Sequence, residues 1–93
     1  MSTRLSPDKI CAAFADTPEK LTVRHLESDT VLIEGSVEAL EFLGNLLIAQ
    51  ARFAKDCGFQ ISPTGAGSAL FSSEATVGVY IHRLPCLEHQ ALE

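Results

Sequence analysis

SVEALEFLGNLLIAQARFAK, residues 36–55, is the strongest structural signal in the chain. Alanine, leucine, glutamate and glutamine, which favour helix formation, make up most of this segment. Ser36 is suited to begin the helix, because its hydroxyl oxygen can accept a hydrogen bond from a free amide of the first turn. Gly58 is suited to end the helix in a left-handed conformation. We therefore predict a long helix over residues 37–55.

The apolar residues of this helix fall on two stripes when they are plotted at about 100° per residue. One stripe is formed by Leu40, Leu43, Leu47, Ala51 and Ala54. The other stripe, about 110° away, is formed by Ala39, Phe42, Leu46 and Phe53. One face of a sheet covers only one stripe, so the other needs a second partner. Two alternatives remain open for Phe42, Leu46 and Phe53: packing beneath a short N-terminal helix, or the seam of a homodimer.

The segments before the long helix predict a short helix and a hairpin. Ser6-Pro7-Asp8 is typical of a helix start, with a capping hydroxyl followed by proline and an acid, so a helix is predicted over residues 6–16. Residues 21–26 and 31–34 have the alternation and β-branching of strands. Residues 27–30 have the composition of a turn, so the two strands are expected to pair as a β-hairpin.

The segments after the long helix predict three more strands, at residues 59–62, 69–71 and 76–83. The last of them alternates, which predicts one face formed by Val77, Val79 and Ile81 and the other by Thr76, Tyr80 and His82. The resulting order α-β-β-α-β-β-β predicts an α+β fold in one domain over residues 1–93. We expect a two-layer sandwich, in which an antiparallel sheet of four to five strands carries the long helix across one face. The termini, residues 1–5 and 87–93, are expected to be frayed.

Composition restricts the partners and the compartment of the chain. Its 93 residues include 7 Lys plus Arg and 12 Asp plus Glu, which give a formal net charge of −5. Nucleic acids and anionic membranes attract basic proteins, so neither is expected as a partner. No apolar run approaches the length of a membrane span or a signal peptide. The three cysteines are sparse and odd in number, which predicts reduced thiols and a cytoplasmic location.

The acidic residues are concentrated in one part of the chain. Between Arg24 and Arg52 there is no lysine or arginine, and there are five acids: Glu27, Asp29, Glu34, Glu38 and Glu41. A concentrated acidic face steers a basic partner toward the protein. The alternative is that these acids only complete a turn and complement a helix dipole, which requires no partner.

The sequence has no convincing catalytic or metal-binding motif. No set of nucleophile, base and orienting group can be identified, so an enzyme is not predicted. His82, Cys86 and His89 have the spacing of metal ligands, but a structural zinc site needs four convergent ligands and commonly uses paired motifs. The glycine-rich loop at residues 65–68 lacks the following helix and the lysine of a phosphate site. We therefore predict no cofactor and no metal.

Three segments carry a resemblance to a known family. They are IEGSVEAL at residues 33–40, LGNLLIAQA at residues 43–51 and VGVYIHRLP at residues 77–85. Together they resemble the family numbered 32 among the immunity proteins of bacterial polymorphic toxin systems, over about residues 21–86. The resemblance implies a stand-alone cytoplasmic inhibitor that binds a toxin and blocks it.

These observations lead to two hypotheses. The first is a non-catalytic protein-binding module, an immunity-type inhibitor that neutralises a basic toxin domain through the acidic face formed by Glu27, Asp29, Glu34, Glu38 and Glu41. The second is a small homo-oligomeric protein, structural or ligand-binding, whose dimer seam contains Phe42, Leu46 and Phe53.

Overall fold

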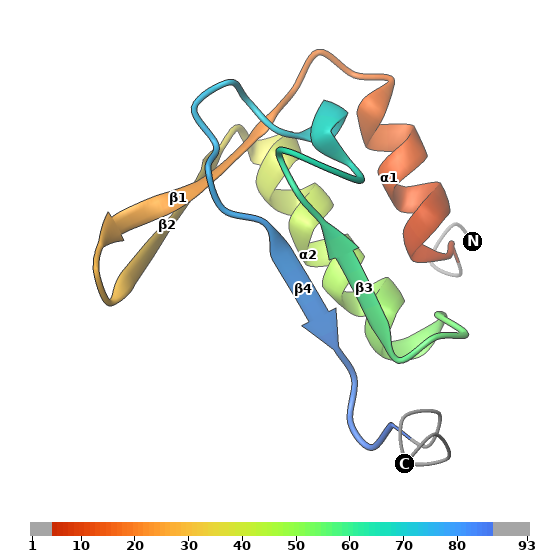
Figure 1. Ribbon diagram of the computed structural model, residues 1–93. Helices are drawn as coiled ribbons and strands as arrows, with labels where there is room; N and C mark the ends of the chain where they lie inside the picture. The colour runs from red at the N-terminus through yellow and green to blue at the C-terminus, as the bar shows by residue number, and fades with distance from the viewer. Residues whose placement is uncertain (1–4, 87–93) are drawn as a thin grey trace.

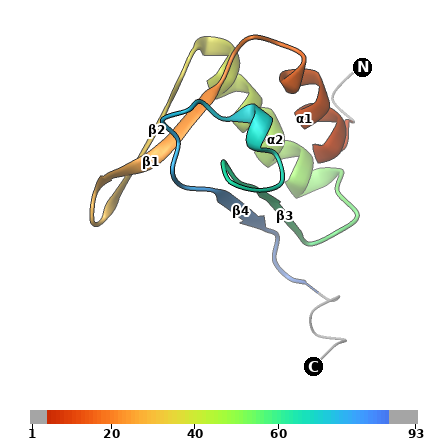
Figure 2. The same ribbon diagram turned by 45° about the horizontal axis from the view of Figure 1, so that its top comes forward.

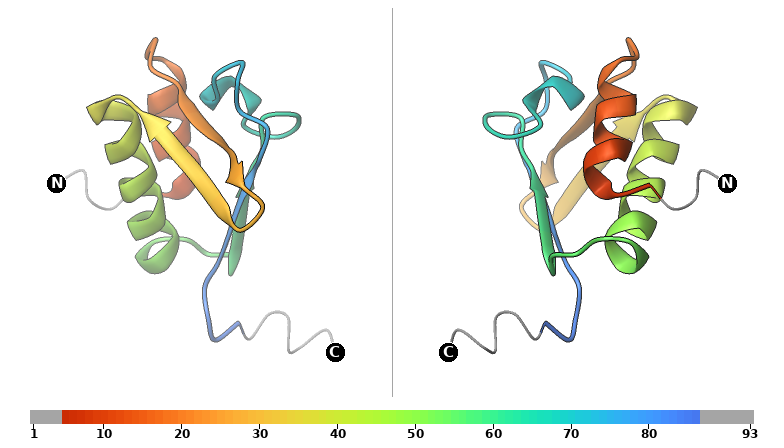
Figure 3. Two further views of the ribbon diagram at one scale, coloured as in Figure 1. Left: turned by 90° about the vertical axis from the view of Figure 1, so that its left-hand side faces the viewer. Right: turned by 90° about the vertical axis from the view of Figure 1, so that its right-hand side faces the viewer.

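The computed structural model describes residues 5–86 and has an α+β fold (Figure 1). Its elements, in chain order, are α1 (Pro7–Ala15), β1 (Leu21–Glu27), β2 (Thr30–Gly35), α2 (Val37–Arg52), β3 (Gly58–Ile61), the 3₁₀ helix η2 (Ser68–Leu70) and β4 (Val79–His82). The two helices lie on one side of the molecule, and β3, β4 and η2 lie on the other (Figure 3).

Both helices begin where the sequence predicts. Ser6 caps α1 and accepts a hydrogen bond from the Lys9 amide, and Ser36 caps α2 in the same way through the Ala39 amide. The predicted end of α2 was wrong. The helix stops at Arg52, before the predicted boundary at residue 55, and Gly58 is the first residue of β3 and not a left-handed cap. Among the described residues the left-handed conformation occurs at Gly67, where φ is 82°.

The strands form two antiparallel pairs, and the single sheet of four to five strands is not confirmed. β1 pairs with β2, and β3 pairs with β4. Residues 71–77 connect the two pairs irregularly: an isolated parallel bridge joins Leu21 to Phe71, and the amides of Thr76 and Val77 both donate to the Val23 carbonyl. Two donors on one carbonyl break the regular spacing of a ladder, so a continuous sheet does not form.

Of the last two predicted strands, the first does not form and the second is shorter than expected. Most of the segment predicted as a strand at residues 69–71 belongs to η2, and the strand predicted at residues 76–83 begins at Val79. The predicted alternation is nevertheless confirmed. Val79 and Ile81 are half-buried and pack against the core, whereas Tyr80 and His82 are exposed.

The core lies between the helices and the strands, and it contains one of the two stripes of α2. Phe42 and Leu46 are 5% and 0% exposed, and the Phe42 ring stacks on Phe14 of α1 with a centroid separation of 4.2 Å. The packing alternative is thus the correct one. Because Phe42 and Leu46 are in the core and Phe53 is half-buried, these side chains do not offer a surface for a dimer seam. The stripe that remains exposed contains Leu40 and Leu47.

Candidate protein-binding surfaces

The outer part of the β1–β2 hairpin projects away from both helices (Figures 1 and 2). We call this part, residues 24–34, the hairpin arm. The first three residues of β1 are buried, whereas the rest of β1 is half-buried or exposed, and β2 is exposed along almost its whole length. The arm therefore extends beyond the core, held at its base by Leu21, Thr22 and Val23.

The arm presents apolar side chains that no other part of residues 5–86 covers. Leu26, Val31 and Ile33 are 55%, 46% and 45% exposed. Ile33 lies directly opposite Val23 in the ladder, and directly opposed residues of an antiparallel pair share one face. Val31 and Ile33 thus continue the face of the hairpin that packs in the core, whereas Leu26 lies at the bulge near the tip. Within the described part of the chain β2 pairs with β1 alone, so its outer edge is also open to pairing with another strand.

The five candidate acids are all exposed, but the structure does not place them in one compact cluster. Glu27 and Asp29 lie at the tip of the arm, where a bulge and the turn reverse the chain. Glu34 lies near its base, at the end of β2. Glu38 and Glu41 lie on α2, where they line a groove against α1 together with Ile10, Ala13 and Asn45. The candidates thus form a tip pair and a helix pair, with Glu34 between them.

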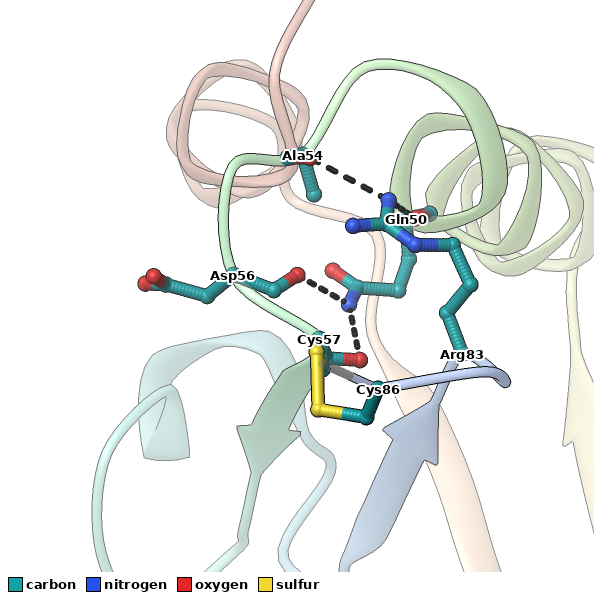
Figure 4. Close-up of a disulfide and its surroundings, with 6 residues drawn as sticks. All are labelled: Gln50, Ala54, Asp56, Cys57, Arg83 and Cys86. Atoms are coloured by element: carbon teal, nitrogen blue, oxygen red, sulfur yellow. Dashed lines mark hydrogen bonds between the residues drawn. A yellow bond between two sulfur atoms is a disulfide. The ribbon is translucent and has the colours of Figure 1, made fainter. Parts of the chain in front are cut away.

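A disulfide joins Cys57 to Cys86 at the ends of β3 and β4 (Figure 4). The prediction that all three cysteines are reduced was therefore wrong. Gly58, the first residue of β3, pairs with His82, the last residue of β4. Cys57 precedes β3 in the chain and Cys86 follows β4, so the two cysteines lie at the same end of the second sheet. Disulfides persist in oxidising compartments. The cysteines therefore no longer support the expected cytoplasmic location.

Two polar side chains fasten the same region to α2 (Figure 4). The Gln50 amide nitrogen donates to the carbonyls of Asp56 and Cys57, at 3.0 and 2.7 Å. The Arg83 guanidinium donates to the carbonyls of Gln50 and Ala54, at 2.8 and 3.1 Å. These bonds satisfy carbonyls at the C-terminus of α2 and in the loop that follows, which have no partners within the helix. Sequence patterns missed this cluster, because its bonds join residues from separate elements.

The histidines and cysteines considered as metal ligands are not brought together. The Cys86 sulfur is bonded to Cys57, and His89 lies outside the described residues. His82 stacks on Tyr80 in the second sheet, whereas the remaining described histidine, His25, is on the hairpin arm. Within residues 5–86 no three side chains of the metal-binding types gather.

The remaining cysteine, Cys11, is half-buried on α1. Burial raises the pKa of its thiol from 9.0 to about 11, and the Asp8 carboxylate acts in the same direction. The reactive thiolate is thus about 100-fold scarcer near pH 8 than in the unfolded chain. We expect iodoacetamide to alkylate Cys11 about 100-fold more slowly in the folded, oxidised protein than in urea; equal rates would contradict this environment.

The same shift makes stability depend on pH. Because the folded state holds this proton more tightly than the unfolded chain does, the contribution of Cys11 is complete below about pH 9 and is lost as the pH rises toward 11. A Cys11→Ser variant removes this contribution, so its free energy of unfolding should fall less than that of the parent over the same pH interval.

None of the helices described within residues 5–86 has the length and hydropathy of a membrane span. Searches against protein-family models, curated proteins and solved structures find no significant match.

Proposed function

We propose that this chain is a non-catalytic protein-binding module, an immunity-type inhibitor that neutralises a basic toxin domain through its hairpin arm and the adjacent acids. The observation that supports the proposal is the exposed arm itself. It carries three large apolar side chains and an open strand edge, and it includes three of the five candidate acids. Its combination of apolar contact, backbone pairing and charge fits a protein partner better than a small ligand.

Each part of the arm has a distinct role in this proposal. Burying the exposed parts of Leu26, Val31 and Ile33 contributes about 25 cal/mol for each Å² of apolar surface removed from water. The open edge of β2 can accept a strand of the partner, which supplies directional backbone hydrogen bonds. The tip pair, Glu27 and Asp29, lies farthest from the core and would meet a basic surface first. Charges in such a position mainly raise the association rate.

The helix pair has a second role that must be separated from binding. Glu38 lies in the first turn of α2, where a negative charge also stabilises the helix dipole. Reversing this charge affects the fold as well as any contact. The tip pair avoids this problem, because Glu27 and Asp29 are exposed at a turn beyond the helices. Variants at the tip therefore test binding most directly.

The proposal requires a toxin partner, which in such systems is the C-terminal domain of a large secreted protein encoded by a neighbouring gene, and the test uses that domain. We expect the Glu27→Lys/Asp29→Lys variant to bind this domain about tenfold more weakly, chiefly through slower association, with a smaller salt dependence than the parent. The Glu38→Lys/Glu41→Lys variant should also bind more weakly. Surface plasmon resonance at two salt concentrations measures both rates, and rescue of growth from the toxin measures neutralisation.

Glu74→Lys is the matched control, because Glu74 is exposed on the segment between η2 and β4 and its reversal changes the net charge by the same amount per site. Its binding should remain close to that of the parent after the general charge effect is subtracted. Parent-like affinity in both double variants would remove the acidic face from the proposal. Parent-like affinity in an Ile33→Ser variant as well would remove the hairpin arm.

A further inference from the structure

A second exposed apolar surface runs along α2. Val37, Leu40, Leu47 and Ile48 are 69%, 46%, 47% and 54% exposed. With the exposed small residues Gly44 and Ala51, they recur at spacings of three and four along the helix. We call these six residues the open stripe: Val37, Leu40, Gly44, Leu47, Ile48 and Ala51. It is a surface of α2 separate from the stripe that packs in the core.

The middle of the open stripe is flat enough for another helix to approach closely. At about 100° per residue, Gly44 and Ala51 lie along its centre, with two large side chains on each side. A Cβ atom placed on Gly44 would meet no other atom of the described residues within 4 Å, so no contact within residues 5–86 explains a glycine here. Glycine in the middle of a helix is unfavourable by comparison with alanine. A helix of a second molecule packed across this position would account for it.

The charges beside the open stripe favour contact with a second copy of the chain whose α2 runs antiparallel to the first. Glu41 borders the stripe in the N-terminal half of α2, and Arg52 borders the same edge in the C-terminal half. In an antiparallel pair of α2 helices, centred near Gly44 and Asn45, Arg52 of one copy lies within about one helical turn of Glu41 of the other. In a parallel pair the edge that carries Glu41 and Arg52 would instead meet the opposite, apolar edge of the partner helix, and these charges would not pair. The surface is therefore complementary to itself in one orientation.

We propose that the open stripe is the contact of a twofold-symmetric homodimer, in which two α2 helices pack antiparallel across Gly44. This proposal does not depend on the inhibitor function. The four large side chains expose apolar surface on the order of 400 Å² per copy. A standard stable interface buries about 800 Å² per partner, so this dimer is a small one with a dissociation constant in the micromolar range.

Sedimentation velocity over about 5–500 µM tests this affinity range directly. The weight-average mass is expected to rise from 10.0 kDa at the low end toward twice that value at the high end. A mass that stays at 10.0 kDa throughout would overturn the proposal, and the open stripe would then be a contact for a different protein.

Gly44→Gln is the sharpest variant, because its side chain has free space within the monomer but occupies the centre of the proposed contact. We expect association at least tenfold weaker and a thermal midpoint no lower than that of the parent, since glutamine is the better helix former. Asn45→Gln is the matched control on the neighbouring, exposed position that faces α1, and it should associate like the parent. Parent-like association of folded Gly44→Gln would overturn the proposed seam.

Charge exchange tests the antiparallel direction. Glu41→Arg and Arg52→Glu should each weaken association severalfold, because each places like charges together across the seam. The variant that combines both should regain much of the parental affinity. If the combined variant associates no better than the single ones, the antiparallel pairing is wrong.

Discussion

Replacing Leu46 by alanine is expected to lower the free energy of unfolding by about 3 kcal/mol. Leu46 is 0% exposed and belongs to the core cluster with Phe42, Leu21 and Leu70, so the truncation leaves a cavity that the surrounding side chains fill only in part. Small domains have total stabilities of about 5–15 kcal/mol, so this loss is a large part of the total. Urea denaturation followed by circular dichroism measures it.

Leu47→Ala is the matched control, since it makes the same change one residue further along α2. Leu47 is 47% exposed, so its truncation should cost less than about 1 kcal/mol when measured below the concentration at which dimers form. The comparison decides which stripe of α2 faces the core. An equal loss for Leu46→Ala and Leu47→Ala would mean that the helix is rotated from the orientation described.

The helices were predictable because their signals are local. Ser6 and Ser36 cap the helices through bonds within three residues, and such bonds can be recognised from spacing alone. The choice between the two apolar stripes of α2 was not local. It depends on Phe14, which is distant in sequence and stacks on Phe42 in space. Periodicity identified both stripes but could not determine which one the rest of the chain covers.

The sheet shows the same distinction between local and distant information. Alternation correctly assigned the inward face of β4, because the period of a strand is a local property. It did not reveal that Thr76 and Val77 share the Val23 carbonyl, which ends the ladder between the two pairs of strands. A strand can be recognised in a single segment, whereas its partner depends on the path of the whole chain.

The candidate surfaces were predictable only in part. The sequence identified five acids between Arg24 and Arg52, but their separation into a tip pair and a helix pair follows from the hairpin register and from the direction in which the arm projects. The exposed apolar side chains Val31 and Ile33 resembled ordinary strand residues. They are exposed because none of the elements described within residues 5–86 covers that part of the hairpin, and this depends on the path of the chain in space.

Removing the disulfide is expected to lower the free energy of unfolding about as much as the Leu46→Ala substitution does. The bond closes a loop with a sequence separation of 29, and the loss of this constraint on the unfolded chain is worth about 3–4 kcal/mol. The Cys57→Ser/Cys86→Ser variant should lose about this much in the free energy of unfolding. Both sulfur positions are almost fully buried, so the two hydroxyls add a further penalty. Denaturation of the parent with and without a reductant gives an independent measurement.

Cys11→Ser separates the effect of the bond from the effect of replacing a cysteine. Cys11 is a free, half-buried thiol, so its replacement should cost about 1 kcal/mol or less and should leave the response of the parent to reductant unchanged. Counting thiols in the denatured protein examines the bond itself, because the intact bond leaves one reactive thiol of the three cysteines before reduction. Three reactive thiols in protein that was never reduced would contradict the bond, and the double variant would then lose only the small packing contribution of its two sulfur atoms.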